Sequence, residues 1–152
     1  MSSNPFTAFP IDIPKKYQEA IKKFCKTGEA REGKLEKWNP EFTPFERQID
    51  FWFMAFLIAV NKELEPEKGI DTYTPITGEI LSRDPKRADF MRLVVLGRTG
   101  DFNILADNRA IFNYCIGLAN AGIPYLIQNL DDPDDRPLWA VLGELELLTK
   151  KN

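Results

Sequence analysis

Histidine is absent from this sequence of 152 residues, and cysteine occurs only twice, at Cys25 and Cys115. Without histidine, the chain can use no histidine-based acid–base mechanism and lacks a ligand that most zinc sites require. The two cysteines are far apart and form neither a C-x-x-C motif nor a disulfide framework. Both fall on apolar helix faces in the sequence pattern, where a thiol is normally a small core side chain. These absences exclude histidine-dependent enzymes and disulfide-stabilised secreted domains.

Long hydrophobic segments and a signal peptide are also missing. The longest uninterrupted apolar run covers residues 51–60, whereas a helix that crosses a bilayer needs roughly 20 such residues. Residues 1–14 have neither the positively charged region nor the long apolar region of a signal peptide. We therefore expect a cytoplasmic protein with no membrane partner, and we expect the run at 51–60 to lie in a buried helix.

Apolar and aromatic residues are abundant enough to build one domain. The sequence is 43% hydrophobic and 12% aromatic, which excludes a wholly disordered chain. Its net charge is −3, which argues against a surface devoted entirely to nucleic acid. We expect an extended N-terminal arm at residues 1–14 and a single helical domain at residues 15–152.

The clearest helix start is the capping box formed by Thr43, Pro44 and Glu46. The helix predicted from this start runs to Asn61. After its first turns this segment is apolar on all sides, which is typical of a helix buried at the centre of a domain.

A second cap-and-proline pair, Asp84-Pro85, predicts a helix to about Leu96 that ends at Gly97 and Gly100. Residues 93–96 would equally suit a buried strand, because a short apolar run does not distinguish the two.

Asp107 predicts the start of a helix over residues 108–121, which Gly122 would close. Pro124 then predicts a short helix to Leu130. Further helices are expected at 15–26 and 137–149, and a short extended piece at 72–74. The fold class that follows is all-α, a single compact bundle of about six helices around the central apolar helix, preceded by the extended arm.

The N-terminal arm is too apolar to remain free in water. Its prolines forbid a helix, so the arm cannot bury its apolar side chains by folding locally. Pro10 and Pro14 would project the segment away from the first helix. We therefore expect contact with a partner protein, rather than with the chain's own body, for four side chains: Phe6, Phe9, Ile11 and Ile13.

No complete catalytic or metal-binding motif is found, and no cofactor is expected. A phosphate-binding loop that began at Gly97 would need a second glycine, a lysine and a serine or threonine further on, where this chain has Phe102, Asn103 and Ile104. The acidic turn at 131–135 lacks the glycine and glutamate of a calcium loop. Two acid-x-lysine triplets, Glu32-Gly33-Lys34 and Asp84-Pro85-Lys86, leave a metal-dependent nuclease as the least excluded enzyme class.

Charge is distributed unevenly along the chain. Residues 1–40 carry eight Lys/Arg against five Asp/Glu, whereas residues 101–152 carry four against eight. A basic stripe of this kind suits a solvated helix face, and it would also suit a phosphate-binding surface. The residues that would form the nucleic-acid interface are Lys15, Lys22, Lys23, Lys26, Arg31 and Lys34.

Two segments carry a resemblance to a known class of proteins. Residues 44–55 read PFERQIDFWFMA, and residues 116–126 read IGLANAGIPYL. Together they resemble small accessory proteins of prokaryotic anti-phage defence systems, notably those associated with DNA phosphorothioation. The resemblance covers roughly residues 42–148 and rests on apolar helical patterning. It implies a protein that works beside DNA-modifying or DNA-cleaving subunits and carries no catalytic motif of its own.

These observations predict a non-enzymatic accessory or regulatory subunit that binds partner proteins in a defence or DNA-modification assembly. DNA would be contacted through that complex, and self-association is compatible with the same prediction. The alternative is a small nucleic-acid-binding domain that uses the basic N-terminal helix and loop.

Overall fold

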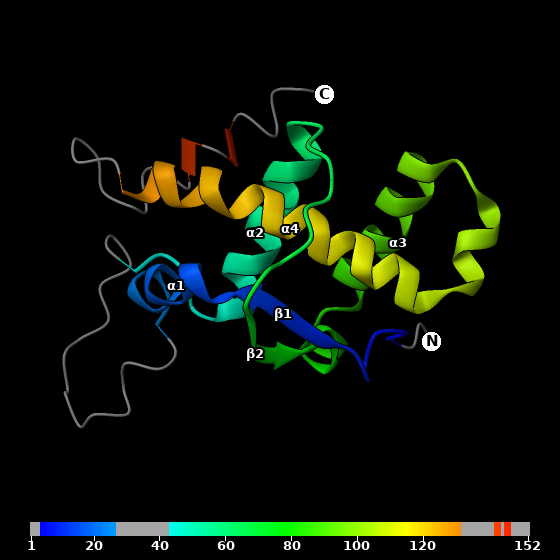
Figure 1. Cartoon of the computed structure of the whole chain (residues 1–152), viewed down its shortest axis with the longest axis horizontal. Helices are drawn as coiled ribbons and strands as arrows, with labels where there is room; N and C mark the ends of the chain where they lie inside the picture. Colours follow the sequence, from blue (N-terminus) through cyan, green and yellow to red (C-terminus); the bar gives the residue numbers. More distant parts are fainter. Residues whose placement is uncertain (1–3, 27–42, 132–141, 144, 147–152) are drawn as a thin grey trace.

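The computed structural model describes residues 4–26, 43–131, 142–143 and 145–146 (Figure 1). The elements in chain order are β1 (Pro10–Pro14), the 3-10 helix η1 (Lys15–Tyr17), α1 (Gln18–Phe24), α2 (Gln48–Asn61), β2 (Thr72–Thr77), the 3-10 helix η3 (Gly78–Arg83), α3 (Pro85–Thr99), the 3-10 helix η4 (Phe102–Ala106) and α4 (Asn108–Leu130). β1 and β2 form a two-stranded antiparallel sheet. The fold is therefore mixed α/β, and the expected all-α bundle of six helices is wrong.

The centre of the fold is the crossing of α2 and α4 (Figure 1). The prediction of a central apolar helix is confirmed, because α2 is buried on nearly all sides. The two helices touch through their backbones at Gly122. A Cβ atom on Gly122 would lie 1.9 Å from the carbonyl oxygen of Ala55. Only glycine permits this approach, so the helix crossing depends on that residue.

α2 begins later than the capping pattern predicts. Its N-cap is Arg47, whose backbone N–H donates to the Asp50 carboxylate at 3.2 Å. The predicted start fails because Phe45 is held in an extended bridge beside Cys25. The Phe45 N–H donates to the Phe24 carbonyl at 3.2 Å, and its carbonyl accepts from the Lys26 N–H at 2.8 Å.

The local signals of α3 predict it well. Pro85 occupies the first turn, and Gly100 ends the helix in the left-handed conformation, with φ of 64°. The Gly100 N–H donates to the Leu96 carbonyl at 2.8 Å. Residues 93–96 are helical, which decides between the two alternatives left open by the sequence. Gly97 lies inside the helix and does not end it.

α4 does not break where the sequence suggests. The cap at Asp107 is confirmed, since its Oδ1 accepts from the Ala110 N–H at 3.0 Å. The helix then continues through Gly122 and Pro124 to Leu130. A proline inside a helix costs about 3 kcal/mol. Three fully or almost fully buried side chains of this last part of the helix offset that cost at roughly 1.5–3 kcal/mol each: Ile123, Leu126 and Leu130.

α4 also has the length and hydropathy of a membrane span, alone among the helices of the described ranges. Of that segment, 61% is buried within the chain, as in the core helix of a folded domain.

Of the helix expected at 137–149, the structure describes residues 142–143 and 145–146, which are helical. The apolar pattern of this segment predicts that Leu142 and Leu145 face the core, but their side chains are 45% and 41% exposed. The expected inward orientation is wrong for these two residues.

The N-terminal arm belongs to the core of the domain. β1 pairs with β2 in a register that sets Ile11 opposite Ile76 and Ile13 opposite Tyr73. Phe6 is fully buried, and its ring centroid lies 5.1 Å from that of Phe112 on α4.

The expectation that the arm binds a partner is therefore wrong for Phe6, Ile11 and Ile13, which are all buried within the chain. Phe9 is partly buried against Phe112, and the guanidinium of Arg109 lies over its ring. The prolines that fix an extended backbone suit the arm to a strand, and β2 supplies its partner. The arm is thus not a unit separate from residues 15–152.

Gly122→Ala should lower the free energy of unfolding by about 3 kcal/mol or more, because the new methyl group meets backbone on α2. Gly97→Ala is the matched control, since no atom of the described residues lies within 4 Å of its Cβ position. It should raise the unfolding free energy by about 0.5–1 kcal/mol. Urea denaturation measures both values. Equal effects at the two positions would contradict the proposed backbone contact.

Phe6→Ala should destabilise the protein by about 3–5 kcal/mol, because it empties a fully enclosed site against Phe112. Phe102→Ala, at a side chain that is 76% exposed, should change stability by less than about 0.5 kcal/mol. Thermal denaturation of the two variants compares them directly. A Phe6→Ala variant as stable as wild type would show that the arm is not part of the core.

Candidate functional site

The strongest candidate for a functional surface is one side of α3. Ala88, Met91 and Val95 form the buried side of this helix. On another side, Leu93 is 65% exposed and Phe90 is 39% exposed. The spacing of three and four residues among positions 90, 93 and 97 places them on one stripe of the helix. We call Phe90, Leu93 and Gly97 the α3 face; Phe102 of η4, the 3-10 helix that follows α3, is 76% exposed.

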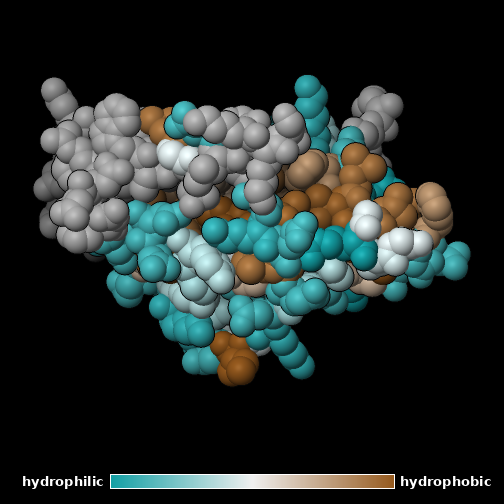
Figure 2. All heavy atoms as spheres, turned by 90° about the horizontal axis from the view of Figure 1, so that it is seen from above, coloured by the Kyte–Doolittle hydropathy of each residue, from teal (hydrophilic) through white to brown (hydrophobic). Residues whose placement is uncertain are grey.

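The α3 face is an exposed apolar patch. Figure 2 shows apolar residues gathered toward the end of the molecule where α3 and η4 lie. One edge of the Phe90 ring packs on Phe53 and Phe56 of α2, with centroid distances of 6.4 Å and 6.2 Å. Single exposed apolar side chains are ordinary, but neighbouring ones that form a patch mark interaction sites.

Charged residues lie at both ends of the α3 face. Lys86 is exposed near the start of α3, and Asp101 is exposed just beyond its end. Among the ion pairs of the described segments, neither residue takes part in one. Arg98 is engaged elsewhere, because it donates to the Leu64 carbonyl at 2.8 Å and the Ala59 carbonyl at 3.3 Å.

A second candidate is the depression beneath the segment that joins α2 to β2. This segment, residues 63–71, is called the strap because it passes across α4 (Figure 1). The strap is tied down at Gly117, whose carbonyl accepts from the Glu67 N–H at 2.9 Å. A Cβ on Gly117 would lie 2.7 Å from the Cβ of Pro66. The strap is therefore packed on the α4 backbone.

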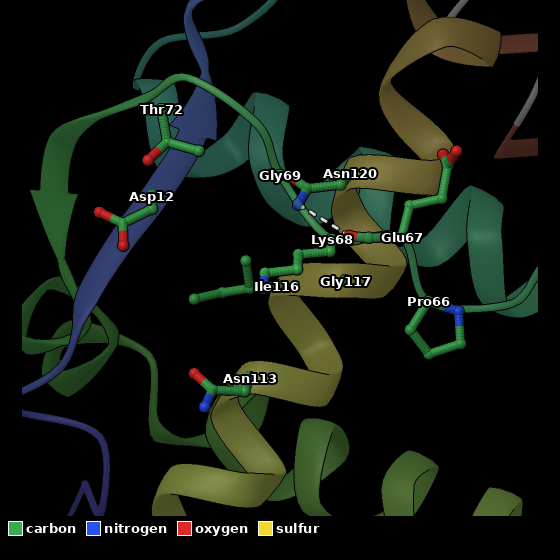
Figure 3. Close-up of a pocket in the computed structure, with 10 residues that line it drawn as sticks. All are labelled: Asp12, Pro66, Glu67, Lys68, Gly69, Thr72, Asn113, Ile116, Gly117 and Asn120. Carbon is green, nitrogen blue, oxygen red and sulfur yellow. Dashed lines mark hydrogen bonds between the residues drawn. The ribbon is translucent and has the colours of Figure 1, made fainter.

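The depression has a volume of about 510 Å³ and is lined by β1, the strap and α4 (Figure 3). The Lys68 side chain extends into it, whereas the Glu67 side chain points away. Asn120 donates through Nδ2 to the Glu67 carbonyl at 3.1 Å, but its buried Oδ1 has no hydrogen-bond partner among the described residues. The lining combines the Lys68 ammonium, the Asp12 carboxylate and the neutral amides of Asn113 and Asn120.

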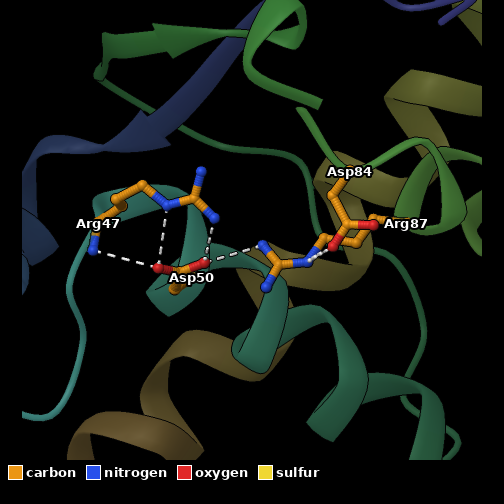
Figure 4. Close-up of polar contacts among 4 residues, drawn as sticks. All are labelled: Arg47, Asp50, Asp84 and Arg87. Atoms are coloured by element: carbon orange, nitrogen blue, oxygen red, sulfur yellow. Dashed lines mark hydrogen bonds and ion pairs between the residues drawn. The ribbon is translucent and has the colours of Figure 1, made fainter. Parts of the chain in front are cut away.

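A network of ion pairs links the starts of α2 and α3 (Figure 4). Asp50 binds Arg47 at 3.1 Å and Arg87 at 3.0 Å, and Arg87 also binds Asp84 at 3.3 Å. Both carboxylates are thus held by guanidinium groups. Across the described part of the chain, no three metal-ligating side chains gather into a group that could hold an ion.

The acid-x-lysine triplets receive no support as a nuclease site. Asp84 forms an ion pair with Arg87, and among the described residues it belongs to no group of acidic side chains that could hold a metal ion. Glu32 and Lys34 lie outside the described residues.

The predicted nucleic-acid interface is only partly within the described chain. Lys15 pairs with Asp71 at 3.7 Å, and Lys23 pairs with Asp131 at 3.4 Å. Lys22 is half-buried and Lys26 is exposed, whereas Arg31 and Lys34 lie outside the described residues. Carboxylates interleave with the described lysines and reduce their attraction for phosphate. The interface stays a prediction.

Both cysteines are buried. Burial, with a further contribution from the Asp50 charge, raises the pKa of the Cys25 thiol to about 12. Burial alone raises the pKa of Cys115. Because the thiolate is the reactive form, neither thiol is poised for nucleophilic chemistry.

Comparison with known proteins adds no relative. No family model matches the chain, and no curated protein or solved structure is significantly similar to it.

The raised thiol pKa predicts a loss of stability at high pH. The Cys25 thiol ionises near pH 9 in the unfolded chain but stays neutral in the folded chain until about pH 12. The contribution of the neutral thiol to the free energy of unfolding is therefore complete below pH 9. Above pH 9 it is lost, and the loss amounts to about 1.4 kcal/mol at pH 10. Cys25→Ala should accordingly lose less stability than wild type between pH 8 and pH 10. Denaturant titrations at the two pH values measure the difference, and parallel losses would contradict the buried, neutral thiol.

Proposed function

We propose that this protein is a non-enzymatic accessory subunit that acts by binding another protein molecule through the α3 face. The observation that carries the proposal is the exposure of Leu93, at 65%, beside Phe90 on one side of α3, with Phe102 of the adjoining η4 exposed at 76%. Burying a side chain of this size is worth roughly 1.5–3 kcal/mol. A partner that covers the patch gains this free energy from several side chains at once.

The chemistry of the other candidate groups supports binding rather than catalysis. The two thiols are buried, and Asp50 and Asp84 are paired with arginines. A general acid or base must reach a substrate and change its protonation state during the reaction, which ion-paired carboxylates do poorly.

A multi-subunit assembly is the setting that this proposal favours. Residues 42–148 resemble accessory proteins of anti-phage defence systems that act on DNA, and such proteins work by contacting other subunits. In this proposal the protein meets DNA only through its partners, and the α3 face takes the role that the sequence assigned to the N-terminal arm.

Affinity purification of tagged protein from its native host tests the proposal. Leu93→Asp should abolish recovery of the bound protein, because the new carboxylate would be buried unpaired in the interface. Ile70→Asp is the matched control, since Ile70 is 82% exposed on the strap, outside the α3 face.

Both variants should melt within about 2 °C of wild type, because surface changes of this kind have small effects on stability. Retention of the bound protein by Leu93→Asp, or its equal loss from Ile70→Asp, would contradict the assignment of the α3 face.

A further inference from the structure

We infer that the depression between β1, the strap and α4 binds a short free peptide by both of its charged ends. Lys68 takes the carboxylate of the peptide and Asp12 takes its ammonium group, while the two asparagines of α4 pair with the peptide group between these ends. The inference goes beyond the proposed function and does not depend on it, because the depression and the α3 face have no residue in common.

Two opposite charges line the depression without pairing with each other. The Lys68 side chain extends into the depression, and Asp12 borders it from β1 (Figure 3). Neither residue takes part in an ion pair with any other described residue, and Asp12 accepts one hydrogen bond, from the Thr74 hydroxyl. A ligand with a single charge would be attracted by one of these groups and repelled by the other. A zwitterion is attracted by both.

The two asparagines of α4 supply the neutral part of the lining. Asn113 and Asn120 are seven residues apart, so they lie on one stripe of the helix, about 10 Å apart along its axis. An amide side chain offers both donors and an acceptor, which are the groups that pair with a peptide N–H and C=O. The lining is therefore complementary to a peptide, whereas a free amino acid has the two charges but no peptide group.

Asn120 carries a hydrogen-bonding atom that the described chain leaves unpaired. Only 4% of this residue is exposed, and its Oδ1 has no hydrogen-bond partner among the described residues. A buried polar atom without a partner costs free energy, so folded proteins retain few of them. The N–H of a bound peptide would satisfy this oxygen.

The strap covers this oxygen, but empty space borders the strap at the same place. Gly69 lies close to the Asn120 amide, since a Cβ on Gly69 would be 3.2 Å from Nδ2. A second depression, of about 460 Å³, borders the same part of the strap and is also lined by Lys68, Gly69 and Asn120. Because both depressions leave space beside residues 68–70, these residues can shift and open Oδ1 to a ligand.

The size and charge of the depression suit a dipeptide or tripeptide. Its volume of about 510 Å³ lies within the range of ordinary ligand sites, about 300–1,000 Å³. A nucleotide of similar size would bring a phosphate group with about two negative charges beside the Asp12 carboxylate, where the lining offers one ammonium group to neutralise them. A short peptide brings one charge of each sign.

Alanyl-alanine, added to the full chain, tests the inference. We expect a dissociation constant between about 0.1 and 5 mM, which is ordinary for a ligand of about eleven non-hydrogen atoms. N-acetylation removes the ammonium charge of this dipeptide, and C-terminal amidation removes its carboxylate charge. Each blocked dipeptide should bind about fivefold more weakly than the free one, because it loses one solvent-accessible charge pair. Titration followed by nuclear magnetic resonance measures the three constants.

Variants of the two charged residues assign each end of the peptide. Lys68→Gln should bind the free dipeptide about fivefold more weakly than wild type does. It should bind the amidated dipeptide at least as well as wild type, because that cation is repelled by the Lys68 ammonium. Asp12→Asn keeps the acceptor for Thr74 and should show the same reversal between the free and the N-acetylated dipeptide. A residue that only shapes the depression would weaken all the ligands alike.

Two variants outside the depression are the matched controls. Lys86→Gln and Asp101→Asn remove the same charges from exposed residues of α3 and of the turn that follows it. Asp101→Asn also keeps the acceptor for the Asn103 N–H, which lies at 2.9 Å. Both controls should bind alanyl-alanine as wild type does. All four variants should melt within about 2 °C of wild type, because they change side chains that contact solvent.

Side-chain amide signals locate the bound peptide. Those of Asn113 and Asn120 should shift during the titration, whereas that of Asn103 on η4 should not. A shift at Asn113 without one at Asn120 would refute the opening of the strap and the pairing of the buried oxygen.

Each remaining outcome overturns a stated part of the inference. Absence of binding at about 20 mM alanyl-alanine, well above the expected dissociation constant, refutes the site. Equal affinity for alanine and alanyl-alanine refutes recognition of the peptide group and leaves a site for amino acids. Equal affinity for the free and blocked dipeptides refutes recognition of the charged ends. Leu93→Asp should bind alanyl-alanine as wild type does, so the failure of either proposal leaves the other standing.

Discussion

The backbone contact between Gly122 of α4 and Ala55 of α2 is the constraint on which the rest of the fold depends. It allows two apolar helices to cross so closely that each buries the centre of the other. The helices α1, α3 and η4 and both strands pack against this pair. The β1–β2 sheet is joined to it through Phe6 and Phe112, and the strap crosses α4 at Gly117, another position without a side chain. Small residues on α4 thus set the distances at which its neighbours lie.

The same arrangement accounts for the exposed face of α3. This helix is held to the start of α2 by the Asp50–Arg87 ion pair and to the core by Met91 and Val95. α2 and α4 are already packed against each other and offer α3 only one side. Its remaining apolar stripe therefore reaches the surface. The α3 face is therefore exposed because α2 and α4 bury most of their apolar surface against each other.

Local signals in the sequence predict where the helices lie better than they predict which residues the helices contact. The apolar run at 51–60 and the Pro85 and Gly100 boundaries of α3 act within a few residues, so they can be recognised without the fold. The role of Gly122 could not be predicted from local signals. A glycine either ends a helix or allows another segment to pack closely against it, and the segment here contains Ala55, far away in the sequence. The bridge of Phe45 to Cys25 moved the start of α2 for the same reason.

The strand pairing and the candidate site were beyond local signals as well. β1 and β2 have to meet before either can be recognised as part of a sheet, and the arm was therefore assigned to a partner. The apolar stripe at 90, 93 and 97 was visible as part of an apolar segment. Which of its side chains stay uncovered depends on where α2 and α4 lie. The sequence thus contains the residues of the α3 face but does not mark them as exposed.

The contact between Phe6 and Phe112 has a consequence for folding during synthesis on the ribosome. The arm is the first described segment to be synthesised, yet its strand partner is β2 and its ring partner lies on α4. Contacts between segments so distant in sequence form slowly and only after the later segment has emerged. The apolar arm of the nascent chain therefore stays uncovered until β2 and α4 have been synthesised. Chaperones that recognise exposed aromatic segments would bind the arm during that interval.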